Sequence, residues 1–520
     1  MKKAIIVFLI LLGVAIIVFV LNFSIVRSHK SKFTGPVSVE DPLPDVLLMA
    51  LEDYVESTMK SNEVPGVAMV LVHGDEVVYS KGLGVRSFET NEPITNETLF
   101  GIGSITKPVT ATVIGAMVDD GVFDWDTKLI EILPSFALSD DAATDQITIE
   151  NTLCMCTGVP RRMEEISVRY EEMSAEDILK SLKKIALKGA YGNSFNYSSR
   201  MVASGGYVAA LAAGGEYGQL AHAYEMMVQD YLLDPLEMTA STFSIKEAVS
   251  SGNFAVPYYS SLSGSEAISP ELEGIFTPIA PAGALWSNAE DMSKFVITLL
   301  NGGISQKGRR IISSESLAYL WEPRVSIDPT IDYGLGWNIE DYHGVTVNFH
   351  PGGTVGFSSE LVIIPDMDIG FVLLANQLDQ VSPIGRLATY RLLEMLTGRD
   401  QIYDHQIGKI ARNTRLQLLQ LGLLTRKKVN LEKMAPFLGK YHNDILGEIE
   451  LVIHDDNTLW VDFGEYETSV RPLIFGDNQF IFFESVFIGK TMSIKIRSDG
   501  RKIIQWTGDE AFYSFLDSNQ

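Results

Sequence analysis

Two blocks of β-type sequence stand far apart in this chain, and a long, mainly helical stretch separates them. In the first, at residues 67–84, β-rich runs flank Gly74 and Asp75, which is typical of a β-hairpin. The second, at residues 345–376, contains the runs VTVNFH, FSSELVIIP and IGFVLLAN. Strands at both ends with helices between them predict one sheet built from distant segments, with helices packed on it and a helical region beside it. We therefore expect an α+β fold.

A second β pattern begins at residue 431. Short β-rich runs recur there, separated by turn sequences such as HDDN at 454–457 and DG at 499–500. Seven or eight strands of this kind predict a small antiparallel barrel or sandwich at residues 431–520. The polar, helix-prone stretch at residues 399–430 is expected to be a helical linker that leads to it.

The amino-terminal segment has a different character. Residues 4–26 carry no charge, and as a helix they would be about 34 Å long, enough to cross a bilayer. A cleaved signal peptide has a shorter apolar region and a small-residue cleavage site, which the following NFSIVR lacks. We therefore expect a single-pass membrane anchor at 4–26 and a linker at 27–45. Long domains are translocated largely regardless of charge, which favours a body outside the cell membrane. Secretion after signal cleavage is the alternative.

Composition excludes several classes of function. Lys plus Arg total 41 and Asp plus Glu total 66 in 520 residues, which gives a net charge of −25. So acidic a chain repels phosphate backbones, and nucleic-acid binding is not expected. Its two cysteines can build neither a disulfide-rich scaffold nor a Cys-rich metal site. The histidines lack ligand spacing and no phosphate loop occurs, so neither a metal nor an organic cofactor is expected.

The candidate chemistry starts from Ser104 and Lys107, a Ser-x-x-Lys motif before a helical pattern at residues 108–119. Positions i and i+3 share one face of a helix, so the Lys107 amine can reach the Ser104 hydroxyl. A serine hydroxyl needs an adjacent base to become a good nucleophile, and a lysine serves if burial lowers its pKa. Taken alone, the motif is weak evidence, because it is more often a capped helix with a surface lysine.

Two further elements lie downstream. Tyr197, in the loop sequence SFNYSS, has a phenol that can relay a proton to a leaving group. His350 opens the sequence HPGGTVGF, where glycines let backbone N–H groups approach a substrate closely. Such an N–H and that of Ser104 would form an oxyanion hole. A buried phenol and a turn histidine are the alternatives for each residue alone, but the combination favours a serine hydrolase.

Together these motifs resemble those of the serine β-lactamase and penicillin-binding-protein superfamily. The likeness is greatest to the branch of class C β-lactamases, DD-peptidases, D-aminopeptidases and related esterases, and it covers roughly residues 46–398. Further blocks support it in the same order: the sequence VPGVAMVLVHGDEVVYSKGLG at 64–84, TLF at 98–100, ITI at 147–149 with TGVP at 157–160, DPLEM at 234–238, PAGALWS at 281–287 with Asp291, and YGLGW at 333–337.

The resemblance implies a role for each matching side chain. Ser104 would be the acylated nucleophile, and Lys107 the base that activates it. Tyr197 would relay protons between these two residues and the leaving group. His350 stands where many relatives have the Lys of a Lys-Thr-Gly motif, and it would help to bind a carboxylate or to polarise Tyr197.

The resemblance also assigns the glycines of this motif. Gly353, beside Gly352, would give the second N–H of the oxyanion hole. The family's Tyr-x-Asn motif reads Tyr197-Ser198-Ser199 here, so Ser199 would offer the substrate one hydroxyl in place of an amide. This departure concerns substrate specificity first and activity second.

A second departure adds two thiols. The family's His-Thr-Ser-Gly stretch reads Met-Cys-Thr-Gly at residues 155–158. Cys154 and Cys156 are close in sequence, at the expected end of a helix, so we expect them to be buried, unpaired apolar residues.

The carboxy-terminal β region resembles the lipocalin-like domain appended to some peptidases of this group, through its strand rhythm and the sequence FLGKY at 437–441. Its expected role is packing or oligomerisation; narrowing the access to the active site is the alternative.

The sequence thus predicts a membrane-anchored serine hydrolase that forms an acyl-enzyme with an amide or ester. Peptides, including D-residue peptides, and small esters are the leading substrates, with β-lactams behind them. The expected partners are this substrate and the lipid bilayer, and a homo-oligomer is left open. The alternative is a catalytically silent member of the fold that serves as a membrane-tethered binding or scaffolding protein, which Ser199 favours slightly.

Overall fold

The computed structural model describes residues 43–399 and 416–518, apart from residues 190, 193, 262–263, 379–383, 417–418, 421, 475–477, 483–486, 488–489 and 509–511. The expected membrane anchor at 4–26 and nearly all of the linker after it lie outside the described residues. Within the described residues, no helix is both long and apolar enough for a membrane span. The chain forms two compact units. The larger takes its described residues from Pro36–Arg162 and Tyr170–Thr414, and the smaller from Met163–Arg169 and Arg415–Gln520.

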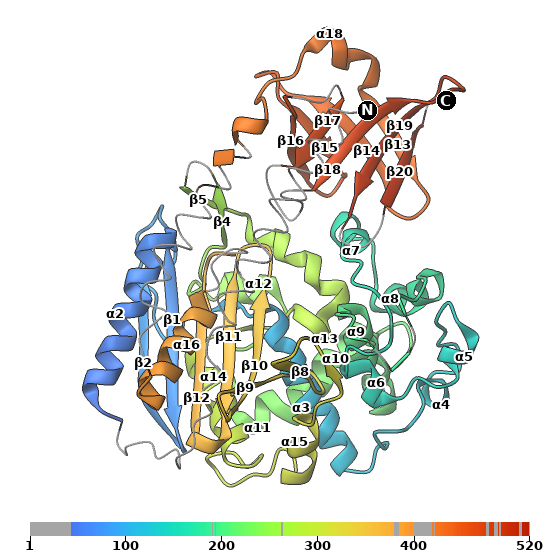
Figure 1. Ribbon diagram of the computed structural model, residues 1–520. Helices are drawn as coiled ribbons and strands as arrows, with labels where there is room; N and C mark the ends of the chain where they lie inside the picture. Colours follow the sequence, from blue (N-terminus) through green and yellow to red (C-terminus); the bar gives the residue numbers. More distant parts are fainter. Residues whose placement is uncertain are drawn as a thin grey trace. The chain divides into compact units, whose positions relative to one another are not determined.

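An eight-stranded antiparallel sheet is the centre of the larger unit, in the order β2-β1-β12-β11-β10-β9-β8-β7 (Figure 1). The strands are β1 Gly66–His73, β2 Glu76–Gly84, β7 Val325–Ser326, β8 Ile331–Tyr333, β9 Asn338–Tyr342, β10 Val345–Gly353, β11 Ser358–Ile364 and β12 Ile369–Ala375. The hairpin β1–β2 joins the late strands through β12, with Val67 opposite Ala375. The prediction of one sheet made from both ends of this unit is confirmed.

Helices cover both faces of this sheet. On one face, α2 (Asp45–Asn62) and α16 (Ile384–Thr397) bury alternate side chains of β1, β10, β11 and β12 in a common apolar core. On the other face, α14 (Ala289–Leu300) packs on β1 and β12. Because β1 and β12 are covered on both sides, they are apolar along almost their whole length.

The helical region lies between the early and late strands in sequence. Its elements are η1 Gly103–Ile105, α3 Thr106–Asp119, α4 Leu129–Ile132, α5 Asp141–Thr144, α6 Ile149–Leu153, α8 Ala175–Ser181, η2 Leu182–Lys184, α9 Ser199–Ala212, α10 Leu220–Val228, η3 Gln229–Leu233, α11 Asp234–Leu236, α12 Ile245–Ser250, η4 Pro270–Ile279, α13 Ala280–Gly283 and α15 Ser314–Leu320. Side-chain caps start several of them, as Thr148 does for α6. Helix α3 is buried along most of its length, so it is a core helix.

Three short elements complete the larger unit. Strands β3 (Phe100–Gly101) and β6 (Trp286–Ser287) pair with each other, as do β4 (Tyr258–Ser261) and β5 (Gly264–Ala267). The turn η5 (Pro365–Met367) joins β11 to β12.

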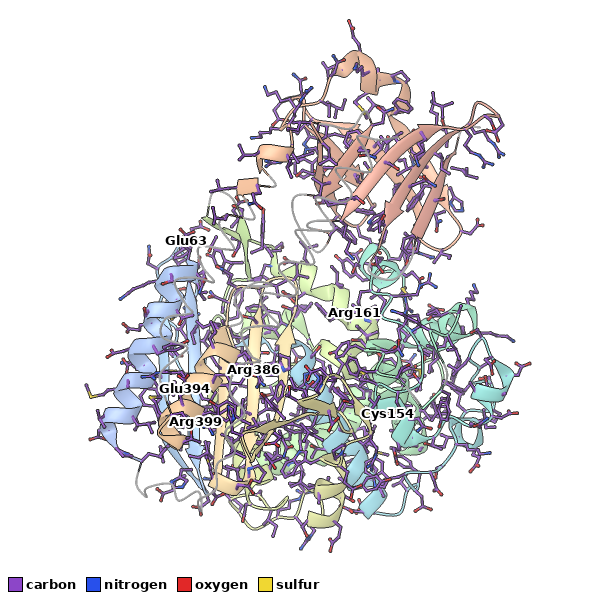
Figure 2. The ribbon with its side chains drawn as sticks, in the orientation of Figure 1. Glu63, Cys154, Arg161, Arg386, Glu394 and Arg399 are labelled. Atoms are coloured by element: carbon purple, nitrogen blue, oxygen red, sulfur yellow. A yellow bond between two sulfur atoms is a disulfide. The ribbon has the colours of Figure 1, made fainter. Side chains whose placement is uncertain are left out.

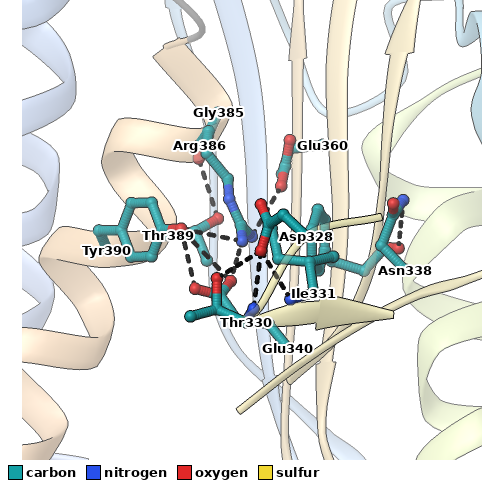
Figure 3. A network of polar contacts seen from close by, with 11 residues as sticks. Asp328, Thr330, Ile331, Asn338, Glu340, Glu360, Gly385, Arg386, Thr389 and Tyr390 are labelled. Carbon is teal, nitrogen blue, oxygen red and sulfur yellow. Dashed lines mark hydrogen bonds and ion pairs between the residues drawn. The ribbon is translucent and has the colours of Figure 1, made fainter. Parts of the chain in front are cut away.

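A buried polar network ties α16 to the sheet (Figure 3). The Arg386 guanidinium pairs with the carboxylates of Glu340 on β9 and Glu360 on β11, the latter at 3.4 Å. Tyr390 donates from its hydroxyl to Glu340 Oε1 at 3.0 Å. One cation therefore serves two buried carboxylates in this network.

The smaller unit is a closed barrel of eight antiparallel strands, and β20 closes it by pairing with β13. The strands are β13 Gly439–Asn443, β14 Gly447–Ile453, β15 Leu459–Asp462, β16 Glu467–Pro472, β17 Gln479–Phe482, β18 Thr491–Ile496, β19 Lys502–Thr507 and β20 Phe512–Asp517, preceded by α18 Leu431–Met434 and η6 Ala435–Phe437. An aromatic cluster that includes Phe463, Phe487 and Trp506 fills its core. Of the small barrel and the sandwich that the strand pattern predicts, the structure forms the barrel.

Helix α7 (Glu164–Val168) belongs to the smaller unit, although the residues on both sides of Met163–Arg169 belong to the larger one. Val168 is 1% exposed and lies in the barrel's apolar core. The Glu164 carboxylate accepts a hydrogen bond from Lys490 Nζ at 3.0 Å. The chain therefore leaves the larger unit after Arg162, adds one turn of helix to the barrel unit, and returns at Tyr170.

Candidate active site

Ser104 and Lys107 lie where η1 runs into α3. Lys107 Nζ donates to Ser104 Oγ at 2.8 Å and to the Ala282 carbonyl oxygen at 2.7 Å. The lysine side chain is 0% exposed, whereas Ser104 is partly exposed. The i, i+3 spacing therefore places a buried amine on an accessible hydroxyl, as the sequence predicts.

The loop that precedes α9 brings Tyr197 to the same hydroxyl. Tyr197 donates from its phenol to Ser104 Oγ at 2.9 Å, across 93 positions of sequence. The Lys107 ammonium lies 4.9 Å from the centre of the Tyr197 ring. Ser104 Oγ is thus contacted by both of the side chains predicted to exchange protons with it.

The pKa values of these two side chains are both lowered, but for different reasons. Burial lowers the pKa of Lys107, and the positive charge of Arg161 lowers it further, while Tyr197 opposes the shift. Burial alone would raise the pKa of Tyr197, but the Lys107 charge and the hydrogen bonds with Lys107 and Ser104 bring it below its ordinary value. Lys107 is therefore closer to its neutral amine, and Tyr197 closer to its phenolate, than either group is in water, which suits proton transfer between them.

His350, on β10, is held in its neutral form. Burial, with the nearby Lys107 charge, lowers its pKa to about 3. His350 Nδ1 lies 2.7 Å from the Pro351 carbonyl oxygen, which can only accept, so Nδ1 carries the proton. His350 Nε2 then accepts from the Tyr333 hydroxyl at 3.1 Å.

This protonation state bears on the two roles expected for His350. A neutral ring that is 1% exposed supplies no positive charge for a carboxylate. Its ring centre is 6.4 Å from that of Tyr197, and its Nε2 is already bonded to Tyr333. Phe195 packs on both tyrosine rings, at 6.5 Å from Tyr197 and 5.7 Å from Tyr333. The geometry therefore indicates that His350 packs beside Tyr197 and supports its ring.

Tyr333 and Phe195 were not among the site residues expected from the sequence. Tyr333 lies in the YGLGW block, and Phe195 lies two positions before Tyr197. Their places in the sequence, in a family block and beside Tyr197, are the features from which both could have been predicted.

The two glycines after Pro351 bring the end of β10 against the turn that carries Ser104. A Cβ added at Gly352 would lie 2.2 Å from the Ile102 carbonyl oxygen, and one added at Gly103 would lie 2.8 Å from Gly353 N. Among the described residues, a Cβ on Gly353 itself would meet only Leu378, at 3.3 Å. Backbone N–H groups at Ser104 and Gly353 can share one oxygen only if their chains approach this closely.

Glu273, on η4, holds the turn that follows Gly353. Its Oε1 accepts from Thr354 Oγ1 and from Gly356 N, each at 3.0 Å. Burial raises the pKa of Glu273 to about 7, against the effect of these hydrogen bonds. No local pattern indicates a role for Glu273, since its partners lie about eighty positions away along the chain.

Ser199 is the first residue of α9 and is partly exposed. Among the hydrogen bonds of the described residues, none joins Ser199 to Ser104, Lys107 or Tyr197. The structure therefore brings together Ser104, Lys107 and Tyr197, with Gly353 beside them, and leaves Ser199 outside their hydrogen bonds.

The prediction that Cys154 and Cys156 remain unpaired is wrong. They form a disulfide, with their Cα atoms 5.2 Å apart. The expectation assumed a helix end, but α6 stops at Leu153, and Met155 takes a left-handed backbone conformation with φ of 55°. The two Cα atoms lie within the range of a disulfide, and the backbone between them is a tight turn and not a helix. Cys154 and Arg161 are both labelled in Figure 2, on the segment between α6 and α7.

No group of His, Cys, Asp and Glu suited to a metal ion occurs within the described part of the chain. The polar groups around Ser104 are instead an amine, a phenol and backbone amides.

Comparison with known proteins agrees with this geometry. A family model described as Beta-lactamase matches residues 51–394, more than half of the chain. An unguisins hydrolase of Aspergillus campestris is 28% identical over 69% of this chain and 67% of its own length. For a second unguisins hydrolase, from Aspergillus violaceofuscus, the match spans only 64% of that protein.

Two penicillin-binding proteins are also similar. Penicillin-binding protein 4 of Amycolatopsis lactamdurans is 24% identical over 62% of this chain and 84% of its own length. The solved structure of an octameric penicillin-binding protein homologue from Pyrococcus abyssi aligns with 90% of this chain and 100% of its own, at a TM-score of 0.60 and 20% identity. That second likeness concerns the fold. Because the family model spans most of the unit that holds Ser104, Lys107 and Tyr197, the chain belongs to the beta-lactamase family.

Proposed function

We propose that this protein is a serine hydrolase that cleaves amides or esters through an acyl-enzyme on Ser104. The observation that best supports this proposal is the double contact at Ser104 Oγ, with Lys107 Nζ at 2.8 Å and the Tyr197 hydroxyl at 2.9 Å. The lowered pKa values of both partners support it as well.

In the proposed mechanism, Ser104 Oγ attacks the substrate carbonyl while its proton passes to the Lys107–Tyr197 pair. Backbone N–H groups of Ser104 and Gly353 stabilise the oxyanion. Tyr197 then delivers a proton to the departing amine or alcohol, and the acyl group stays on Ser104. Water attacks the ester, its proton returns through the same pair, and a carboxylic acid leaves. Neutral His350 and Tyr333 keep the Tyr197 ring in place.

The proposed substrates are peptides, including D-residue peptides, or small esters, with β-lactams as a further class. One relative is named a hydrolase and another a penicillin-binding protein, which agrees with acyl transfer on such substrates. Because His350 is neutral, a positively charged side chain elsewhere would have to recognise a substrate carboxylate. Arg161, whose guanidinium carbon lies 5.7 Å from the Tyr197 ring centre, is the nearest exposed one that the structure describes there.

For location we propose a single-pass anchor at residues 4–26 with the body outside the cell membrane, or secretion as the alternative. The disulfide between Cys154 and Cys156 supports an oxidising compartment. We propose that the barrel is a lipocalin-like packing or oligomerisation module. The octameric homologue from Pyrococcus abyssi supports a test of self-association.

The experiment is mass spectrometry of the purified full-length chain after treatment with a fluorophosphonate or a penicillin. We expect a covalent adduct on Ser104 that Ser104→Ala abolishes. Lys107→Met should slow its formation by about 10²- to 10⁴-fold, because the base is lost. Lys60→Met, at a side chain 81% exposed, is the matched control and should leave the rate unchanged. A folded protein that no probe acylates would favour a catalytically silent binding or scaffolding protein.

A further inference from the structure

A disulfide-closed turn lies directly behind the loop that carries Tyr197. Cys154, Met155 and Cys156 follow α6 and are all buried. Met155 is held in the left-handed region, with φ of 55°. Long side chains seldom adopt this conformation, so it persists only where the surrounding structure enforces it.

Met155 presents two acceptors to the loop. Asn196 N donates to the Met155 carbonyl oxygen at 2.8 Å, and Ser198 N donates to Met155 Sδ at 3.1 Å. Asn196 and Ser198 are the residues immediately before and after Tyr197. One side chain and its own carbonyl therefore hold the backbone on both sides of Tyr197.

The neighbouring residues extend this attachment along the loop. Gly192 N donates to the Cys156 carbonyl oxygen at 2.8 Å, and the Tyr191 hydroxyl bonds to Asn151 Oδ1. Before the turn, the Leu153 carbonyl oxygen accepts a hydrogen bond from Gly336 N at 3.1 Å. The turn is thus a fixed support between the body of the unit and the Tyr197 loop.

The disulfide closes a small ring around Met155. With the ring closed, the Met155 carbonyl oxygen accepts from Asn196 N. If the ring opens, Met155 can relax to an ordinary backbone conformation, which turns both acceptors away from the loop. Tyr197 would then lose the support that keeps its hydroxyl 2.9 Å from Ser104 Oγ.

We propose that the Cys154–Cys156 disulfide is a redox-sensitive positioning element for Tyr197, active when closed and impaired when reduced. The proposal rests on the proposed role of Ser104 as nucleophile. Reduction by a dithiol breaks the S–S bond with two electrons, each sulfur gains a proton, and the dithiol becomes a disulfide. Cys154, Met155 and Cys156 touch no reacting atom, so they are positioning residues.

The first test measures phosphonylation of Ser104 by a fluorophosphonate in the full-length chain, in which Ser104 Oγ bonds to phosphorus and fluoride leaves. The limiting rate and the half-saturating concentration are determined separately. In Cys154→Ala/Cys156→Ala, the limiting rate should fall by about 10- to 100-fold, because Tyr197 is misplaced. The half-saturating concentration should stay within about twofold, because the variant leaves binding groups in place. Met155→Leu keeps the carbonyl but removes the sulfur acceptor, and should give a smaller loss of the limiting rate.

The second test reduces the wild-type protein with dithiothreitol and follows alkylation of the two thiols by mass spectrometry. The loss of the rate of Ser104 phosphonylation should track the reduced fraction, and the same treatment should leave the rate of Cys154→Ala/Cys156→Ala unchanged.

Three outcomes would overturn the inference. They are an unchanged limiting rate in the double variant, a loss carried by the half-saturating concentration, and a disulfide that dithiothreitol cannot reduce in the folded protein. Each leaves the proposed hydrolase function standing. Absence of acylation in the wild-type protein would remove that function, and this inference with it.

Discussion

At the Ser104 hydroxyl, burial decides which neighbouring groups carry charge. Lys107 and His350 are almost completely buried, and burial lowers both pKa values. The consequences differ because the partners differ. Lys107 donates to Ser104 and is coupled to a tyrosine of lowered pKa, whereas His350 is bonded to a carbonyl and to a hydroxyl. One residue is thus ready to exchange a proton, and the other is fixed as a neutral support.

The same principle gives a pH dependence to the network around Arg386. Burial raises the pKa of Glu360 from 4.5 to about 7, while Arg386 opposes the shift and Glu340 adds to it. A raised carboxyl pKa means that the folded protein binds a proton that the unfolded chain releases above about pH 4.5. The resulting stability is complete below that pH and is lost as the pH rises to about 7.

Glu360→Gln should remove this term. We expect the free energy of unfolding of the wild type, minus that of the variant, to fall by about 1–3 kcal/mol between pH 4.5 and 7. Urea unfolding at several pH values measures it, with Glu315→Gln at an exposed site as the control. A difference that stays constant over this range would mean that Arg386 keeps Glu360 ionised throughout.

At the scale of elements, the contact between η1 and β10 sets the site. Gly103 has φ of 53°, and Gly352 and Gly353 let the strand end approach it. No side chain can be added at Gly103 without moving Gly353, whose N–H is assigned to the oxyanion hole in the proposed mechanism.

Gly103→Ala should therefore slow phosphonylation of Ser104 by a fluorophosphonate by about 100-fold, because its Cβ would lie 2.8 Å from Gly353 N. Gly121→Ala is a matched control, since Gly121 also has a positive φ, of 72°, and its Cβ would meet nothing within 4 Å. It should share the backbone strain without the loss of rate. Fluorophosphonate kinetics on both variants decide the matter, and equal rates would show that this approach is not needed for catalysis.

At the scale of the whole molecule, the barrel unit includes a helix from the middle of the chain. Val168 of α7 is buried in the barrel core, and Glu164 pairs with Lys490. The barrel's stability therefore depends on a segment that is far from it in sequence.

Val168→Ala should destabilise the barrel by about 1–3 kcal/mol through the cavity it leaves. The measurement is hydrogen exchange by mass spectrometry on strands β13 to β20, which should exchange faster in the variant. Ile496→Ala, at a side chain 61% exposed on β18, removes more atoms but should change the exchange less. If Val168→Ala leaves the protection of the barrel strands from hydrogen exchange unchanged, then α7 does not contribute to the stability of that core.

Local pattern by itself determined the architecture of each unit and the pairing of Ser104 with Lys107. Strand alternation and apolar runs indicate which faces are buried, and i, i+3 spacing indicates which residues share a helix face. Both patterns can be recognised in short stretches of the chain. The sheet from distant segments and the β-barrel were predictable for this reason.

Tertiary structure decided the rest, because burial and partner choice depend on residues that are remote in sequence. The Tyr333 hydroxyl donates to His350 Nε2, although the sequence predicted that His350 would contact Tyr197 or a substrate. Glu273 accepts hydrogen bonds from the turn that follows Gly353. The left-handed Met155 makes possible a disulfide that spacing alone argued against. Helix α7 belongs to the barrel unit because Val168 is buried in the barrel core. No local sequence pattern indicates in which of two cores an apolar side chain will be buried.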